Sequence, residues 1–236
     1  MLYFPRAGIM KNLLRDITPP LVWRILCKMD RREILAPPQS WDFGSQQPAQ
    51  YYDEQFKQKK MLQVHYSKAY HYPLWAVIAD RLERVKAQSI LDIGCSAGQL
   101  ASLLRDKGIP HYLGLDFSSV RIEYARQICP EYSFVVADVF ETALIKTHPY
   151  DTFLAIEFLE HVEDDLALVE MIRPGSRVLI SVPSFPNMAH IRHFNSMTEV
   201  RQRYEPYLQH PNITELLLDP QGRKFYLIEG VRCTVA

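Results

Sequence analysis

Little in this sequence points to a disulfide-bonded, membrane-spanning or nucleic-acid-binding protein. Its 236 residues include only four cysteines, and none form a C-x-x-C pair, which argues against a disulfide scaffold or a zinc ribbon. No apolar run approaches the roughly 20 residues of a membrane span, and the first residues lack the pattern of a signal peptide. The 27 basic residues balance the 27 acidic ones, so no net positive charge favours a nucleic-acid partner. These absences favour a cytoplasmic protein.

Three regions follow one another along the chain. Residues 1–50 form a proline-punctuated amphipathic extension, and residues 51–88 form a helical segment rich in Tyr and His that we expect to act as a lid. Residues 89–236 carry short apolar runs separated by helical stretches. Within the extension, residues 9–35 mix Leu, Ile and Trp with Arg and Lys, so they could rest on an anionic inner membrane surface, dock on a partner, or pack on the domain itself.

Seven apolar runs predict the strands of one sheet, at residues 89–95, 111–117, 132–139, 150–156, 176–183, 212–219 and 224–232. The first five alternate with helical stretches, which is typical of parallel strands with helices on both faces. Only "PQGR" separates the last two runs, which suits a hairpin. We therefore predict an α/β fold, a seven-stranded, mostly parallel Rossmann-like sheet with an antiparallel last strand, plus the helical N-terminal extension.

Glycines and carboxylates follow the first three predicted strands. In "ILDIGCSAGQL", Gly94 and Gly98 let the backbone turn sharply and approach a ligand, and Asp92 can orient that loop or meet a cationic group. Asp116 ends the second strand, where a carboxylate can accept the ribose hydroxyls of a nucleoside, and Asp138 ends the third, placed for an adenine amino group. Such strand ends bind ligands in parallel sheets.

The glycine turn does not match the motifs that bind phosphate chains. A dinucleotide fingerprint, G-x-G-x-x-G, would need glycine where this chain has Ser96 and Gln99, and the Gly-Lys-Ser/Thr of a phosphate-binding loop is absent. The loop therefore predicts a nucleoside ligand without a phosphate chain.

The motifs "ILDIGCSAG", "YLGLDFS", "VVADV" and "EFLEHV", in this order, resemble those of the class I S-adenosylmethionine-dependent methyltransferases over roughly residues 89–236. The family pattern is D-x-G-x-G-x-G, and Ser96 stands at its middle glycine. The resemblance implies S-adenosylmethionine as cofactor, with Gly94 and Gly98 along its methionine part, Asp116 at the ribose and Asp138 at the adenine. The implied cofactor site also includes Asp92, Cys95, Phe117, Val139 and Glu157.

The stretch "EFLEHVEDD" gathers acidic side chains after the fourth strand. On a helical turn, Glu157, Glu160 and His161 would share one face, and His193 in the loop after the fifth strand would lie on the same side of the sheet. These four residues suit a divalent ion such as Mg²⁺ or Mn²⁺. Two alternatives stay open. His161, His193 or Glu157 could be catalytic without metal, or the cluster could be structural, with Glu160 at a helix N-terminus.

Glu-x-x-Glu-His at this place resembles ubiquinone-biosynthesis O-methyltransferases, small-RNA 2′-O-methyltransferases and a branch associated with surface polysaccharides. The resemblance implies methylation of a hydroxyl on a sugar, glycolipid or small aromatic metabolite. An RNA 2′-O-methyltransferase with a metal at this cluster is the first alternative, and a non-catalytic binding module that keeps the fold is the second. For the acceptor we predict contacts with His190, Arg192, Tyr70 and Tyr72.

Overall fold

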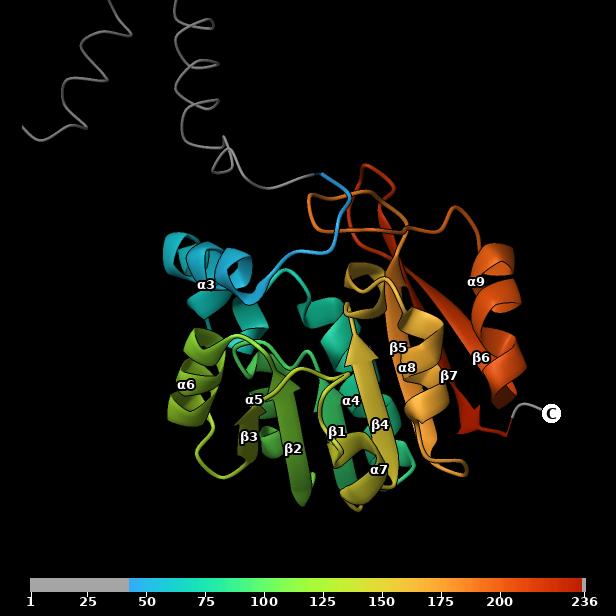
Figure 1. The fold of residues 1–236 in the computed structure, drawn as a ribbon, viewed down its shortest axis with the longest axis horizontal. Helices are drawn as coiled ribbons and strands as arrows, with labels where there is room; N and C mark the ends of the chain where they lie inside the picture. Colours follow the sequence, from blue (N-terminus) through green and yellow to red (C-terminus); the bar gives the residue numbers. More distant parts are fainter. Residues whose placement is uncertain (1–42, 235–236) are drawn as a thin grey trace, which may run out of the picture. The chain divides into compact units, whose positions relative to one another are not determined.

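The computed structural model describes residues 43–234 of the chain (Figure 1). The predictions for residues 9–35, and for most of the extension 1–50, lie outside the described residues. No helix of the described part is long and apolar enough to cross a membrane.

All seven predicted strands are present in one sheet: β1 (Ser89–Ile93), β2 (His111–Asp116), β3 (Ser133–Val136), β4 (Thr152–Ile156), β5 (Arg177–Pro183), β6 (Leu208–Leu217) and β7 (Lys224–Arg232). Their order is β3-β2-β1-β4-β5-β7-β6. β7 pairs antiparallel with both β5 and β6, while the first five strands pair in parallel, so the predicted antiparallel last strand is confirmed. β7 lies inside the sheet, and β6 forms the edge.

In the described part of the chain, two helices precede β1, namely α3 (Ala49–Gln58) and α4 (Tyr72–Arg84). The helices between strands are α5 (Gln99–Asp106), α6 (Ser119–Ile128), α7 (Leu144–Thr147), α8 (Asp165–Met171) and α9 (Met197–Tyr204). Single 3₁₀ turns are η1 (Lys60–Gln63), η2 (Tyr66–Lys68), η3 (Leu159–His161) and η4 (Glu205–Tyr207). The cap of α6 follows from its sequence, because the Ser118 hydroxyl accepts a hydrogen bond from the Arg121 backbone N–H at 3.2 Å.

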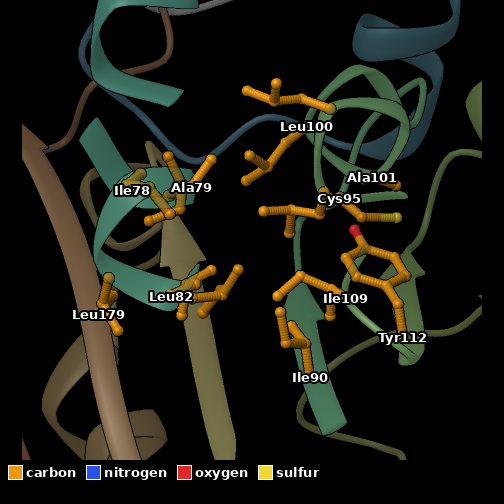
Figure 2. Close-up of a cluster of buried hydrophobic side chains, with 14 of the residues drawn as sticks. Ile78, Ala79, Leu82, Ile90, Cys95, Leu100, Ala101, Ile109, Tyr112 and Leu179 are labelled. Atoms are coloured by element: carbon orange, nitrogen blue, oxygen red, sulfur yellow. The ribbon is translucent and has the colours of Figure 1, made fainter. Parts of the chain in front are cut away.

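Two hydrophobic cores cover the two faces of the sheet. Neighbouring residues on one strand enter opposite cores, since side chains alternate along a strand: Ile90 joins the first cluster and Leu91 the second. Figure 2 shows the first cluster, where Ile78 and Leu82 of α4 gather with Ile90 of β1. Burial on both faces explains why these strands are near-continuous apolar runs.

The stretch from Gly44 to the end of α3 crosses the end of the sheet where the parallel strands finish (Figure 1). The Gly44 N–H donates to the Met188 carbonyl at 2.8 Å, and Asp53 on α3 accepts a hydrogen bond from the Ser118 hydroxyl at the end of β2. Figure 1 shows α3 above α6, beyond the tips of the strands. This placement suits the lid predicted for residues 51–88, although closing of a lid stays a prediction.

Candidate active site

The loop between β1 and α5 holds three bends in the left-handed region. Gly94 has φ 68°, Ser96 has φ 51° and Gly98 has φ 75°. A Cβ on Gly94 would lie 2.2 Å from the Phe158 ring, and one on Gly98 would lie 2.8 Å from Cβ of Ala125, so packing as well as backbone conformation requires both glycines. Ser96, at the middle glycine of the family pattern, thus has a left-handed backbone, which glycine adopts more easily than serine.

Asp116 anchors this loop from the end of β2. One carboxylate oxygen accepts the Ser96 N–H at 3.0 Å, and the other accepts the Ser118 N–H at 2.8 Å. Burial raises the pKa of Asp116, and the nearby Arg121 guanidinium opposes that rise. Arg121 also donates to the Ser96 hydroxyl at 3.1 Å. Because a carboxylate offers about four lone-pair positions, Asp116 can still accept a hydroxyl from a ligand.

Asp92 and Cys95, two predicted cofactor residues, direct their side chains into the protein. The Tyr112 hydroxyl donates to Asp92 at 2.5 Å, so Asp92 braces β1 against β2, and burial raises its pKa to about 7. The thiol of Cys95 is buried against Gly114, where an added Cβ would lie 2.7 Å from the sulfur. Because its thiol is buried, Cys95 can contribute to the predicted cofactor site only through its backbone, and that contribution stays a prediction.

Phe117, Val139 and Asp138 follow β2 and β3. Phe117 is half-buried, with its ring centroid 5.4 Å from that of Tyr52. Asp138 is exposed, and one carboxylate oxygen accepts the Phe140 N–H at 2.8 Å. Val139 belongs to the second core, so it supports the site from beneath.

These residues fit S-adenosylmethionine. Two carboxylates, Asp116 and Asp138, can accept ribose hydroxyls and an adenine amino group. Phe117 and Phe158 offer apolar ring surface, and the loop from Gly94 to Gly98 presents backbone without bulky side chains. All lie at the carboxyl ends of neighbouring parallel strands, beside β1, where the order of the strands reverses.

Glu157 follows β4 in a strained conformation, with φ 52°. Its N–H donates to the Ser181 hydroxyl at 2.8 Å, and that hydroxyl donates back to the Glu157 carboxyl at 2.8 Å. The helical turn η3 begins only at Leu159. The prediction that Glu157 shares a helical turn with Glu160 and His161 is therefore wrong, because Glu157 is fixed by β5 instead.

Glu160 is fully buried beside Glu157. Neither of its carboxylate oxygens has a hydrogen-bond partner among the described residues, although Nε2 of His161 lies 3.8 Å away. Burial raises the pKa of Glu160 to about 8, and burial together with the charge of Glu160 raises the pKa of Glu157 well above its usual range. A buried carboxylate without donors needs a cation or a proton, so this pair is prepared for one of them.

Two imidazoles complete the cluster. Nδ1 of His161 lies 2.8 Å from the Ala189 carbonyl, and Nδ1 of His190 lies 2.9 Å from the Phe185 carbonyl. A carbonyl only accepts, so each Nδ1 carries the proton and each Nε2 keeps its lone pair. Burial lowers the pKa of His161 to about 3 and lowers that of His190, so both rings are neutral.

Glu160, His161 and His190 each offer one ligand atom, and these atoms lie within 4.8 Å of one another. Of the four residues predicted to hold a metal, the structure brings only Glu160 and His161 into this group. His193 is exposed and stands outside the cluster, and His190, predicted to contact the acceptor, takes its place. Glu157 lies beside these three residues but is not one of the group, and metal binding at this place stays a prediction.

Arg192, predicted to contact the acceptor, holds the turn that carries the cluster. Its guanidinium donates to the Leu159 carbonyl, to the Val162 carbonyl at 2.5 Å and to the Glu163 carbonyl at 2.8 Å. It also lies 3.5 Å from the buried Asp165. These contacts leave little of the guanidinium for an acceptor and favour a structural role.

Tyr52 was missing from the predicted site. Its ring lies 5.4 Å from Phe117 and edge-on to His161 at 6.0 Å, and the Arg121 guanidinium lies 5.0 Å from its centre. Tyr52 therefore joins the cofactor end of the site to the cluster. The pair Tyr51-Tyr52 was visible in the sequence, but only the docking of α3 decides that Tyr51 is buried and that Tyr52 faces the site.

The two tyrosines predicted to contact the acceptor differ in position. Tyr70 is exposed, with the Arg223 guanidinium 5.7 Å from its ring centre. Tyr72 begins α4, stacks on Tyr66 with ring centroids 6.1 Å apart, and packs against the first core. Tyr70 can therefore meet a ligand, whereas Tyr72 serves packing.

Comparison with known proteins gives the same assignment as the motifs. The model of a family described as "Methyltransferase domain" matches residues 90–179. The ubiquinone biosynthesis O-methyltransferase of Pectobacterium carotovorum is 33% identical over 112 residues, covering 44% of this chain and 46% of the relative. The chain thus matches about half the length of this curated relative.

Two solved structures share the fold. The N-methyltransferase NodS of Bradyrhizobium japonicum, in complex with S-adenosylhomocysteine, has a TM-score of 0.53 at 15% identity, covering 68% of this chain and 87% of that one. The 1,6-didemethyltoxoflavin-N1-methyltransferase of Burkholderia thailandensis has a TM-score of 0.56 at 17% identity, covering 70% and 79%. The matched domain, the sheet order and the loop geometry together support a class I S-adenosylmethionine-dependent methyltransferase domain over residues 90–179.

Proposed function

We propose that this chain is an O-methyltransferase that uses S-adenosylmethionine and holds a divalent ion at Glu160, His161 and His190, where the acceptor hydroxyl binds. The names of its curated relatives support oxygen as the methylated atom, since they are ubiquinone biosynthesis O-methyltransferases and the O-methyltransferase rstn1 of Aspergillus nomiae. The acceptor that we propose is a hydroxyl on a sugar, glycolipid or small aromatic metabolite.

The observation that carries the proposal is the state of the three side chains. Both imidazoles direct a lone pair from Nε2, with Nδ1 fixed by a carbonyl, which is the usual arrangement around a metal-binding histidine. Glu160 supplies a buried carboxylate that no donor among residues 43–234 satisfies. Two nitrogens and one carboxylate suit a borderline ion such as Mn²⁺ more than the all-oxygen preference of Mg²⁺.

The bound cofactor supplies an activated methyl group, and a bound ion would lower the pKa of the acceptor hydroxyl. The residues of the chain hold and orient these groups. The loop from Gly94 to Gly98 and Asp116 position the cofactor, and Tyr52 closes the space between Phe117 and His161. Once a bound cation offsets the charge of Glu160, the carboxyl of Glu157 could release its own proton, and the oxygen that Ser181 leaves free could then take the proton of the hydroxyl.

Methyl transfer and metal binding should fail together when Glu160 is changed. Full-length protein would be incubated with S-adenosylmethionine, Mn²⁺ and vicinal diols of three kinds, namely catechols, sugars and RNA ends. Glu160→Gln should lose saturable Mn²⁺ binding and about 100-fold or more of the transfer rate, while S-adenosylhomocysteine still binds. Glu163→Gln, an exposed neighbour, is the matched control.

Transfer that survives Glu160→Gln unchanged would refute the metal site and leave an O-methyltransferase without metal. Failure of the purified protein to bind S-adenosylmethionine would instead favour a non-catalytic module that keeps the fold. A second candidate function, 2′-O-methylation of RNA, is supported by the same cluster, because a terminal ribose also presents a vicinal diol. The chain's net charge of zero counts against that function.

A further inference from the structure

An aromatic and cationic surface lies on one side of the cluster. We call it the acceptor wall; it consists of Tyr70, which precedes α4, Phe185, which follows β5, and Arg223, at the turn between β6 and β7. The Arg223 guanidinium lies 5.3 Å from the centre of the Phe185 ring and 5.7 Å from that of Tyr70. Three segments that are distant in sequence thus meet at the guanidinium of Arg223.

The turn between β6 and β7 fixes the orientation of Arg223. One oxygen of Asp219 accepts the N–H groups of Gln221 at 3.1 Å and Arg223 at 3.2 Å, and the other accepts Nε of Arg223 at 2.5 Å. Within residues 43–234, the two terminal nitrogens of Arg223 have no hydrogen-bond acceptor, and its side chain is 46% exposed. The fork that binds carboxylates and phosphates is therefore held in place and left available.

The acceptor wall continues directly into the proposed active site. The Phe185 carbonyl is the group that fixes Nδ1 of His190, and the two rings are 5.7 Å apart. On the other side of the wall, burial raises the pKa of the Tyr70 hydroxyl, and the Arg223 guanidinium beside its ring opposes that rise. Through Phe185, a ligand on the wall would lie beside His190 and therefore beside the proposed site of methyl transfer.

We propose that the acceptor is acidic: its ring packs on Tyr70 and Phe185, Arg223 binds its carboxylate or phosphate, and its hydroxyl reaches Glu160, His161 and His190. This inference rests on the proposed function and narrows its acceptor class. Aromatic faces suit the flat ring of a phenol or the apolar face of a sugar. Arg223 then selects among hydroxyl compounds by charge, because an acceptor without the anion leaves the guanidinium with no partner from the ligand.

Two matched pairs of acceptors test the inference on the full chain with S-adenosylmethionine and Mn²⁺. Protocatechuate is compared with protocatechuyl alcohol, and a hexose phosphate with the free hexose. Within each pair the acceptors differ in the anionic group, and the two pairs together distinguish an aromatic acceptor from a sugar. We expect the acid of at least one pair to have the higher kcat/KM. Arg223→Gln should lower kcat/KM for that acid by roughly 10- to 100-fold, mainly through KM, and leave the neutral partner within about twofold.

Arg223→Lys should restore part of the preference for the acid, since lysine keeps the charge but not the fork. Arg84→Gln is the matched control, because Arg84 also forms an exposed i, i+4 ion pair, with Asp80 at 2.9 Å on α4. If wild-type protein methylates acidic and neutral partners equally, or if Arg223→Gln weakens both alike, the inference is refuted while the proposed function stands. If no acceptor of either pair is methylated, the proposed O-methyltransferase function fails for these classes and the acidic acceptor fails with it.

Discussion

The imidazoles of His161 and His190 lie with their ring centroids 5.0 Å apart, although η3 carries one and the loop after β5 carries the other. Both rings are held by carbonyls of the same short loop, those of Ala189 and Phe185. One backbone segment therefore sets the tautomer of both histidines, and Nε2 of His161 lies 3.8 Å from the Glu160 carboxylate. Such a preformed arrangement lets a cation bind without reorganising the rings.

Replacing His190 should abolish metal binding, whereas replacing His193 should not. We expect His190→Asn to weaken Mn²⁺ binding to protein loaded with S-adenosylhomocysteine by about 100-fold or more, because one of three ligands is lost. His193→Asn, three residues further along and exposed, should bind Mn²⁺ as the wild type does. Calorimetric titration measures both. The opposite pattern would show that the loop rearranges so that His193 enters the site.

Arg192 should affect stability and metal affinity, not acceptor recognition. Its side chain is 16% exposed and satisfies the carbonyls of Leu159, Val162 and Glu163. Arg192→Gln should lower the free energy of unfolding by about 2 kcal/mol, because several of these carbonyls lose a charged donor. Urea denaturation measures the change. A raised KM for the acceptor with unchanged stability would instead favour the contact with the acceptor that the sequence predicts.

The backbone at Ser96 gives a prediction in which glycine is the better substitute. Both Ser96→Gly and Ser96→Ala lose the hydrogen bond from Arg121, so that loss cancels when the two variants are compared. With φ 51°, Ala is strained and Gly is not, and we expect the glycine variant to be more stable by about 1 kcal/mol in urea denaturation. Ser102, inside α5, is the control position. There we expect Ser102→Ala to be more stable than Ser102→Gly by about 1 kcal/mol, because alanine favours a helix interior and glycine does not.

The sheet could be predicted because each strand can be identified from its own short run of residues, without knowledge of its partners in the sheet. Runs such as "SILDI" in β1 and "TFLAI" in β4 are apolar on both faces, and the helices between them carry their own turn signals. The carboxylates at Asp116 and Asp138 follow from the strand ends alone, since parallel strands finish at one edge. Thus the fold and the outline of the cofactor site were accessible from the sequence.

The details of the cluster were not accessible in this way. Glu157 adopts a left-handed backbone conformation, which cannot be predicted for a non-glycine residue from its sequence. Its N–H also donates a hydrogen bond to Ser181 on β5, a strand that is distant in sequence and becomes its neighbour only in the folded sheet. His190 and His193 lie in one loop, and the path of that loop alone decides which ring turns inward. Tyr52 and Arg223 come from segments outside the motifs, so their places depend on how α3 and the β6–β7 turn pack.

Asp92 should make the stability of the protein depend on pH. Its pKa is about 7 in the folded protein, because of burial, against a usual value near 3.8. Between these values the folded state keeps a proton that the unfolded state has released, so raising the pH favours unfolding. The stabilising contribution of Asp92 is thus present below about pH 4, declines toward about pH 7 and is absent above it.

Asp92→Asn cannot ionise, so its stability relative to the wild type should improve by about 2 kcal/mol between about pH 5 and about pH 7, as measured by urea denaturation. Comparing the two proteins at each pH removes the contributions of the other buried carboxyls, Glu157 and Glu160. Tyr112→Phe removes the hydrogen bond that favours the ionised form, so in that variant the decline should extend to higher pH. A constant difference between Asp92→Asn and the wild type over this range would mean that Asp92 is already ionised in the folded protein, and that the bond from Tyr112 outweighs the cost of burial.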